Sequence, residues 1–401
     1  MPTLTNKYHM YPTSDAEKKL VEALETCRWL YNRLLEEIRK AKEDGAPLRM
    51  YDCHNMIPML KGENPALGNV YSKVLQMVSQ TLWANIRGLS QLKKNGRRIG
   101  HIRFKGAGWY KTLNYNQSGF SFDGDVLHLS KIGDVRVKLH RPIQGNVKGV
   151  IVKREGEKWY AIVQIDTIVQ ELSKNDRIVG IDMGLKAFAV DTDGHEFENP
   201  RYLGRTLDRI KIAQRNLSRK KKGGSNRGKA KAKLAKLYEK VNNQRNDFLH
   251  KLSRFYVNTY GTICVEDLDI KGLKEKGHNH GLHRNIHDAG WARFLSMLDY
   301  KAESAGRRLV KVDARGTTQR CYRCGNNVPK ELKDRVHDCP HCGLVADRDY
   351  NSAHNILIAG MGHPGEPVEP RPLLHLTAEQ ALAMNQEAKA FSLMQIRARP
   401  W

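Results

Sequence analysis

The pattern of apolar and polar positions divides the 401-residue chain into a helical part, a strand-rich part and a mixed part. Residues 3–10 alternate as a short strand does. The capping box Ser14–Glu17 then precedes an apolar spacing that predicts a helix to about residue 42. A second helical spacing covers residues 69–94. Short alternating runs over 101–170, separated by Gly and Asp, predict an antiparallel sheet or a small barrel.

The second half of the chain alternates between predicted strands and helices. Residues 178–190 predict two strands that turn at Gly184, and residues 262–266 predict a buried strand that ends at Glu266. The remaining pattern predicts charged helices over 203–259 that break at 223–226, then a Gly- and His-rich mobile lid over 278–287 and a helix through Trp291. It also predicts a strand at 309–312, a helix from Asp349 to Ile358 and helical potential over 377–395. This order of elements predicts an α+β multidomain chain.

The charge balance predicts a polyanionic partner. The chain carries 68 Lys and Arg against 43 Asp and Glu, a net charge of +25. Nucleic acid fits this excess better than a membrane surface, because no basic amphipathic anchor stands out. No apolar run reaches the roughly 18 residues of a membrane span, and no apolar core follows Met1 as in a secretory signal. We therefore expect no membrane partner and a prokaryotic cytoplasmic location, at the nucleoid when DNA is bound.

Four of the seven cysteines form two Cys-x-x-Cys pairs: Cys321, Cys324, Cys339 and Cys342. Two such pairs in an otherwise cysteine-poor chain predict one structural Zn²⁺ rather than a disulfide framework, in keeping with a reducing compartment. Gly325 and Gly343 follow the pairs, where the backbone must fold back towards sulfur. His337 and His341 lie close by, but four thiolates complete the site, so we expect both histidines to be bystanders.

Three acids each stand at the end of a predicted element: Asp182 and Glu266 end strands, and Asp349 begins a helix. A hairpin, a strand and a helix in this order are what a ribonuclease-H-like sheet needs to bring three distant carboxylates together. Such carboxylates can hold two Mg²⁺ ions about 4 Å apart, an arrangement that hydrolyses phosphodiesters. Singly, Asp182 is also typical of a turn, Glu266 of a surface and Asp349 of an N-cap. The ordered set in a basic chain favours catalysis.

A basic stretch follows the first acid. Eighteen Lys and Arg lie between residues 201 and 255, opposed by only Asp208, Glu239 and Asp247. A solvated helix face normally mixes signs, so this excess predicts a surface that tracks a phosphate backbone. The candidate nucleic-acid-binding residues are Lys220, Lys221, Lys222, Arg227 and Lys229.

Together these motifs resemble TnpB, a family of transposon-encoded RNA-guided nucleases related to type V CRISPR effectors. The resemblance rests on Gly180-Ile-Asp182-Met-Gly184, Val265-Glu266-Asp-Leu268, Thr317-Thr-Gln-Arg-Cys321 with both cysteine pairs, Asp347-Arg-Asp349-Tyr-Asn351-Ser-Ala353-His-Asn355, Ile102-Arg-Phe-Lys105 and Leu139-His-Arg-Pro142. In that family the acids form a RuvC site, whose third member is the Asp two residues before the Asn, here Asp349. Asp347 is the competing candidate, and Ser352 stands where members often carry Ala.

The resemblance also implies an architecture. A wedge-type β-barrel would comprise residues 1–13 and 96–172, and a helical recognition domain over 14–95 would be inserted into it. A RuvC domain over 173–315 and 345–360 would be interrupted by a zinc ribbon over 316–344 that binds target nucleic acid. Residues 361–401 would form a variable tail, a region where family members often lack order.

The function implied is an RNA-guided DNA endonuclease of a transposable element. A guide RNA from the transposon end would pair with double-stranded target DNA beside a short transposon-associated motif. A monomeric ribonucleoprotein is favoured. Two alternatives stay open. A DDE-type transposase also uses three acids, although the zinc insertion between the second and third acids argues against it. A nuclease-silent RNA-guided repressor would share the fold with a broken acid set, whereas this chain keeps all three acids.

Overall fold

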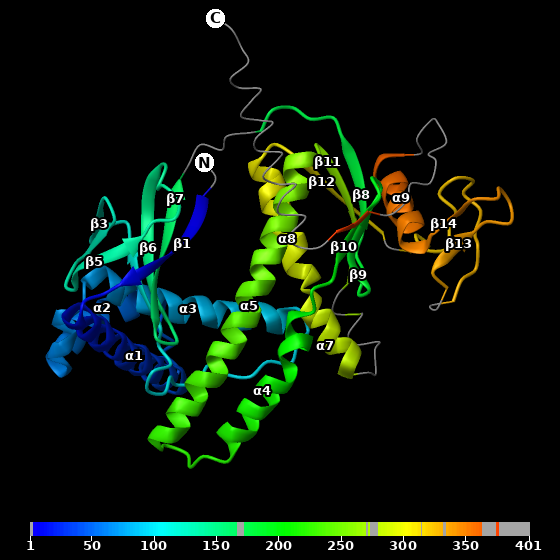
Figure 1. Cartoon of the computed structure of the whole chain (residues 1–401). Coiled ribbons are helices and arrows are strands. Elements are labelled where there is room, and N and C mark those ends of the chain that lie inside the picture. Colours follow the sequence, from blue (N-terminus) through cyan, green and yellow to red (C-terminus); the bar gives the residue numbers. More distant parts are fainter. Residues whose placement is uncertain are drawn as a thin grey trace, which may run out of the picture. The chain divides into compact units, whose positions relative to one another are not determined.

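A computed structural model of the chain describes residues 3–166, 172–269, 272, 280–313, 315–331, 334–362 and 374–376 (Figure 1). The chain divides into two compact units, residues 1–168 and 169–401. Within the described ranges, no helix has the length and apolar character needed to cross a membrane.

The first unit combines an antiparallel sheet with helices. Its strands are β1 (Thr3–Tyr11), β2 (Thr112–Asn116), β3 (Phe120–Asp123), β4 (Val126–Leu129), β5 (Gly133–Lys138), β6 (Asn146–Glu155) and β7 (Lys158–Asp166). Its helices are α1 (Ser14–Glu43), α2 (Met50–Glu63), the 3₁₀ helix η1 (Pro65–Asn69) and α3 (Ser72–Lys94). The strand order is β2-β6-β7-β1-β5-β4-β3. The described pairs do not include one between β2 and β3, so they form an open order, without the closure of the expected barrel.

The helices of this unit are inserted between β1 and β2 in the chain, as the pattern predicted. Leu20, Leu24 and Leu34 of α1 are buried in one core with Val74 and Leu82 of α3. The predicted capping box is wrong by one residue, because Thr13 is the N-cap of α1 and accepts from the Ala16 N–H at 3.3 Å. The pattern did not predict α2, whose interior carries Pro58.

The second unit is built on a mixed sheet. Its strands are β8 (Ile178–Asp182), β9 (Ala187–Asp191), β10 (His195–Glu198), β11 (Thr262–Glu266), β12 (Arg308–Val312) and β15 (Leu374–Leu376), with a separate hairpin of β13 (Val336–Asp338) and β14 (Val345–Asp347). Its helices are α4 (Tyr202–Ser218), α5 (Ser225–Thr259), α7 (His280–Ala289), α8 (Trp291–Ser304) and α9 (Arg348–Met361). The sheet order is β12-β11-β8-β9-β10-β15. Strands β8, β9 and β10 form an antiparallel meander, whereas β11 and β12 run parallel to β8.

Helices cover both faces of this second sheet (Figure 1). On one face, Val179 and Val265 are buried in a core with Phe248 of α5 and Phe294 of α8. On the other face, Cys264 is buried with Ile356 of α9. The sheet therefore has two different faces, and α9 lies alone on one of them among the described helices.

The loop expected for the lid at 278–287 is wrong for its described part, because residues 280–289 form α7. Burial of Ile286 and Ala289 anchors this helix, and Gly290 ends it at a positive φ of 75°. The buried Asp288 carboxylate accepts from the backbone of α4 and from Arg245. The helical potential over 377–395 lies outside the described residues, and Leu374–Leu376 pairs in parallel with β10.

Candidate active site and zinc-type cluster

Two parallel strands bring Asp182 and Glu266 to one edge of the second sheet. Strands β8 and β11 are paired so that Ile181 lies opposite Val265. Asp182 and Glu266 are the next residues of their strands and close them at the carboxyl edge. Because side chains alternate between faces, Asp182 shares a face with Gly180, and Glu266 shares one with Cys264. That face is the one that α9 covers.

Helix α9 approaches this face closely because glycine leaves room for it. A Cβ at Gly180 would lie 2.2 Å from the carbonyl oxygen of Ala353, and one at Gly360 would lie 2.6 Å from Sγ of Cys264. Two glycines, one on the strand and one on the helix, thus let α9 lie flat across β8 and β11. Asp349 stands in the first turn of α9, and its charge acts on Asp182 at the end of β8.

The two candidate third acids have different environments. Asp347 is the N-cap of α9, and its Oδ1 accepts from the N–H of Asp349 at 2.7 Å and of Tyr350 at 3.2 Å. The Asp349 carboxylate is not part of this cap and lies 3.4 Å from Nε of Arg348. The capping role considered for Asp349 therefore belongs to Asp347.

The carboxylates influence one another electrostatically. Burial raises the pKa of Asp182 well above its ordinary value, and Glu266, Asp349 and Asp347 raise it further, while Arg348 opposes them. Burial also raises the pKa of Glu266, which is 7% exposed, although the Thr317 hydroxyl donates to its Oε1 at 2.8 Å and acts in the opposite direction. Carboxyl groups that repel in this way form a donor set for hard cations.

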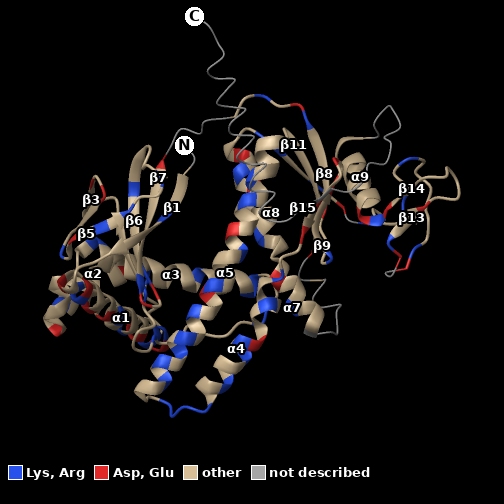
Figure 2. Ribbon diagram, viewed as in Figure 1, with Lys and Arg blue, Asp and Glu red and all other residues tan. Residues whose placement is uncertain are grey.

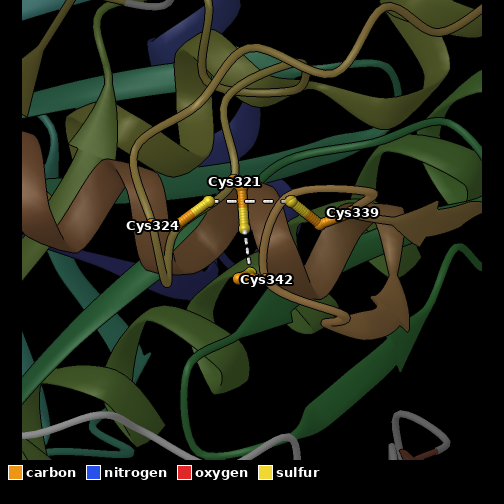
Figure 3. A group of neighbouring side chains, drawn as sticks. All are labelled: Cys321, Cys324, Cys339 and Cys342. Carbon is orange, nitrogen blue, oxygen red and sulfur yellow. Dashed lines mark hydrogen bonds between the residues drawn. The ribbon is translucent and has the colours of Figure 1, made fainter.

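The four paired cysteines converge on one point (Figure 3). Sγ of Cys321 lies 3.7 Å from that of Cys342, and Sγ of Cys324 lies 3.6 Å from that of Cys339. A tetrahedron with Zn–S bonds of about 2.3 Å has sulfur–sulfur edges of about 3.8 Å, so the cluster has the size that Zn²⁺ requires. Among the described residues it is the one group of three or more candidate ligands with all ligand atoms within 4.8 Å. The three acids are more widely spaced.

The turns of the cysteine cluster follow the expected glycine positions. Gly325 and Gly343 have φ of 75° and 69°, and each donates its N–H to the carbonyl of the first cysteine of its pair at 2.9 Å. His337 is buried, and its Nδ1 contacts Lys330 instead of joining the cluster. Burial and the Lys330 charge lower the pKa of His337 to about 4, which keeps it neutral.

Two asparagine side chains of α9, to which the sequence analysis assigned no role, attach the segment around Cys321 to the helix. Nδ2 of Asn355 donates to the carbonyls of Thr317 at 2.8 Å and Arg320 at 2.6 Å, and Nδ2 of Asn351 donates to Arg320 at 2.8 Å. Asn351 Oδ1 also accepts from the Tyr322 N–H at 3.1 Å. One helix thus carries Asp349 towards the sheet and fixes the cysteine cluster with its amides. Thr317, Asn351 and Asn355 all lie in motifs that carried the family resemblance.

The basic stretch forms the helical hairpin α4–α5, and Figure 2 shows Lys and Arg along both helices and the turn between them. Lys220, Lys221, Lys222 and Lys229 are exposed. Arg227 differs from them, because its Nη1 donates to the carbonyls of Leu217 at 2.8 Å and Lys220 at 3.0 Å at the end of α4. Its guanidinium therefore holds the turn.

Family comparisons match three separate parts of the chain. Residues 156–277 match OrfB_IS605, described as "Probable transposase", and residues 291–356 match "Cas12f1-like, TNB domain". Residues 1–45 match a model described as "Helix-turn-helix domain", although here they contain β1 and α1. A protein of Streptomyces pristinaespiralis named "Putative RNA-guided DNA endonuclease" is 30% identical over 382 residues, covering 91% of this chain and 92% of that protein. The chain belongs to the TnpB family.

Further comparisons agree with this TnpB membership. "TnpB-like protein L770" of Acanthamoeba polyphaga mimivirus is 27% identical over 252 residues, covering 56% of this chain and 46% of that protein. A solved structure titled "Cryo-EM structure of the Cas12f1-sgRNA-target DNA complex" shares the fold at a TM-score of 0.54 and 14% identity, covering 88% of this chain and 98% of that one. The TnpB resemblance drawn from the sequence motifs is confirmed.

Proposed function

We propose that the protein is an RNA-guided DNA endonuclease of a transposable element. The observation that carries this proposal is the placement of Asp182 and Glu266 at the ends of adjoining strands on the sheet face that α9 covers. Asp349 stands in the first turn of α9, near enough for its charge to raise the pKa of Asp182. These three carboxylates are the proposed catalytic residues of a RuvC site. The matched relative of similar length is named for the same activity, which supports the proposal.

The acid centre would hold Mg²⁺, two ions as the sequence led us to expect. Its donors are carboxylate oxygens from three elements. Their mutual repulsion contributes to the raised pKa of Asp182, and a bound cation would relieve that repulsion. When bound, the ions would supply charge neutralisation at the attacking and leaving oxygens of the phosphodiester. The chain's own part is positioning. Thr317 fixes the Glu266 carboxylate, and the cap at Asp347 uses only the backbone N–H of Asp349, which leaves the Asp349 carboxylate outside the capping hydrogen bonds.

The cysteine cluster would bind one structural Zn²⁺ through Cys321, Cys324, Cys339 and Cys342. Its sulfur–sulfur distances of 3.6 and 3.7 Å support this assignment. We also propose the domain division that the resemblance implies: wedge over 1–13 and 96–172, recognition helices over 14–95, RuvC over 173–315 and 345–360, and a target-binding zinc ribbon over 316–344. The variable tail would begin at residue 361.

The partners would be a guide RNA from the transposon end and double-stranded target DNA beside a short transposon-associated motif. Base pairing would then read the target sequence, while the protein supplies charge and geometry. The exposed lysines of the α4–α5 hairpin support this division, since phosphate contacts position nucleic acid without reading it. We expect a monomeric ribonucleoprotein.

The test begins with the RNA that purifies with the protein. This RNA is sequenced, its guide segment is replaced by a chosen sequence, and the complex is offered linear DNA targets in Mg²⁺. We expect cutting of a matching target beside the permitted motif and intact DNA when the guide is mismatched or the RNA is removed. Cutting and joining of transposon ends without RNA would identify a DDE-type transposase instead. Guide-dependent binding without cutting would identify a repressor.

A further inference from the structure

A cavity of about 340 Å³ opens beside the carboxyl end of β8. Its lining comes from the β8–β9 turn, the segment before α4, helix α7 and the hairpin that carries the cysteine cluster: Leu185, Lys186, Asn199, Arg201, Asn285, Asp288 and Arg335. The volume lies within the range of small-ligand sites. Nothing in the acid centre or the cysteine cluster accounts for it.

The electrostatics of this cavity favour an anion. Lys186, Arg201 and Arg335 carry three positive charges in its wall, and Asp288 is its one carboxylate among the described lining residues. That carboxylate is already satisfied. Its Oδ1 lies 2.6 Å from Nη2 of Arg245, and its oxygens accept from the backbone N–H of Leu203 at 3.0 Å. No described carboxylate forms an ion pair with Lys186 or Arg335, so their charges remain available.

Local contacts hold the wall of the cavity in a fixed shape. Arg201 is a non-glycine residue in the left-handed region, with φ of 47° and ψ of 45°. Its Nη2 and the Nδ2 of Asn199 both donate to the carbonyl of Leu185, at 3.2 and 3.0 Å. A strained backbone persists where surrounding contacts determine it, and such residues gather at functional sites. The contacts to the Leu185 carbonyl therefore order a cationic wall.

The cavity adjoins the proposed catalytic acids from two directions. Lys186 lies four residues after Asp182, in the turn that leaves β8. From the other side, the carbonyl of Arg335 accepts from the N–H of Arg348 at 2.8 Å, and Nε of Arg348 lies 3.4 Å from Oδ1 of Asp349. A strand whose phosphodiester lies on the acids would therefore pass the cavity within its neighbouring nucleotides.

We propose that this cavity binds a phosphate of the DNA strand being cut, close to the cleaved bond, through Lys186, Arg201 and Arg335. The inference rests on the proposed nuclease function and assigns the site that fixes the position of the cut strand. Guanidinium and ammonium groups are the side chains best suited to phosphate oxygens, and a phosphate held beside the reacting one limits where the strand can move. The three cations are phosphate-binding residues and take no part in the bond-breaking step.

A scan with methylphosphonate substitutions tests this site. Each target carries one uncharged methylphosphonate at a defined position of the cut strand near the cleaved bond, and affinity is measured without divalent metal alongside cleavage in Mg²⁺. In the wild-type complex we expect one position at which loss of charge weakens both by about tenfold, the worth of one charge-assisted hydrogen bond. In Arg335→Gln, the unmodified target should show that same loss, and methylphosphonate at that position should add nothing further.

Two variants serve as comparisons. In the Lys186→Gln complex, methylphosphonate at the same or an adjoining position should cause no loss beyond that caused by the substitution itself. Arg323 is exposed between Cys321 and Cys324, outside the cavity wall, so the Arg323→Gln variant should retain every penalty of the wild type. Thermal melting checks that the Arg335→Gln and Lys186→Gln variants are folded. If methylphosphonate weakens the folded Arg335→Gln complex at every position by the same factor as the wild type, the proposed phosphate site is wrong. A wild-type complex that never cuts would instead contradict the nuclease, while the affinity arm still reports on the cavity.

Discussion

Gly180 of β8 lies directly beneath Ala353 of α9, and a Cβ at this glycine would stand 2.2 Å from the Ala353 carbonyl oxygen. The helix could not cross the strand this closely if residue 180 carried a side chain. Since Asp349 is one turn before Ala353, the same contact sets the distance between Asp349 and Asp182. The glycine in the Gly-Ile-Asp motif is therefore part of the site geometry.

Gly180→Ala should lower stability and cleavage together. The added methyl group meets backbone, so α9 must shift, at a cost of about 1–3 kcal/mol that is typical of overpacking. Thermal melting and cleavage rates measure the two effects. Gly228→Ala, in α5 with nothing within 4 Å of the new Cβ, is the folding control and should melt no lower than the wild type. A Gly180→Ala protein as stable and active as the wild type would contradict the close packing.

The purified protein should contain about one zinc per chain, because four thiolates fill a tetrahedral site. Cys342→Ser should lower the zinc content and the melting temperature, since the metal and the fold of this region depend on one another. Metal analysis and thermal melting with and without a strong chelator test this. A zinc-free wild type with an unchanged melting temperature would show that the cluster has no structural metal.

Thr317→Val should shift the acid limb of the cleavage profile to higher pH. Burial raises the pKa of Glu266, and the Thr317 hydroxyl lowers it by donating to the carboxylate. Without that donor the pKa rises, so the carboxylate becomes protonated at a higher pH and activity is lost sooner on acidification. A partner of this kind is worth about 10–100-fold in metal affinity or activity. Thr318→Val is the neighbouring control, and an identical profile in both variants would contradict the role of Thr317.

Neutralising Lys220, Lys221 and Lys222 should reduce the salt dependence of nucleic-acid binding by the intact ribonucleoprotein. Three lost phosphate contacts lower the slope of log affinity against log salt by about 2 to 3. The loss should be the same for any guide or target sequence. Lys19→Gln is the control, because the Lys19 ammonium already faces Asp15 at 2.7 Å. An unchanged slope in the triple variant would identify the run as a solvated surface.

Most regular elements were predictable because their packing leaves a periodic trace. Helix α1 buries Leu20, Leu24 and Leu34 at helical spacing, and β8 and β11 are apolar runs ending in acids. Helices α2 and α7 were missed for the opposite reason. Pro58 interrupts the pattern of the first, and the second is held by only two buried apolar residues, Ile286 and Ala289, together with the buried carboxylate of Asp288. So few buried residues leave no repeating apolar spacing in the sequence.

Within the site, the order of the three acids was readable, but their supports were not. The family motif favoured Asp349 over Asp347, but the different environments of the two carboxylates depend on the cap contacts from Asp347 to the N–H groups of Asp349 and Tyr350, which only the structure shows. Asn351 and Asn355 bind backbone carbonyls 31 and 38 residues away, so no local spacing reveals these partners. The same holds for the cationic cavity around Arg335, which four separate segments assemble.

The most direct test of the account compares Asp182→Ala, Glu266→Ala and Asp349→Ala with Asp347→Ala in one assay. Each ribonucleoprotein is given its matched DNA target, and affinity without divalent metal and cleavage in Mg²⁺ are recorded on the same preparation. We predict that the first three variants bind the target with near wild-type affinity and do not cut it. Asp347→Ala loses a helix cap, worth about 1 kcal/mol, and should be less stable but still able to cut. Undiminished cutting by the first three variants, or full activity in Asp349→Ala with none in Asp347→Ala, would contradict the proposed acid centre.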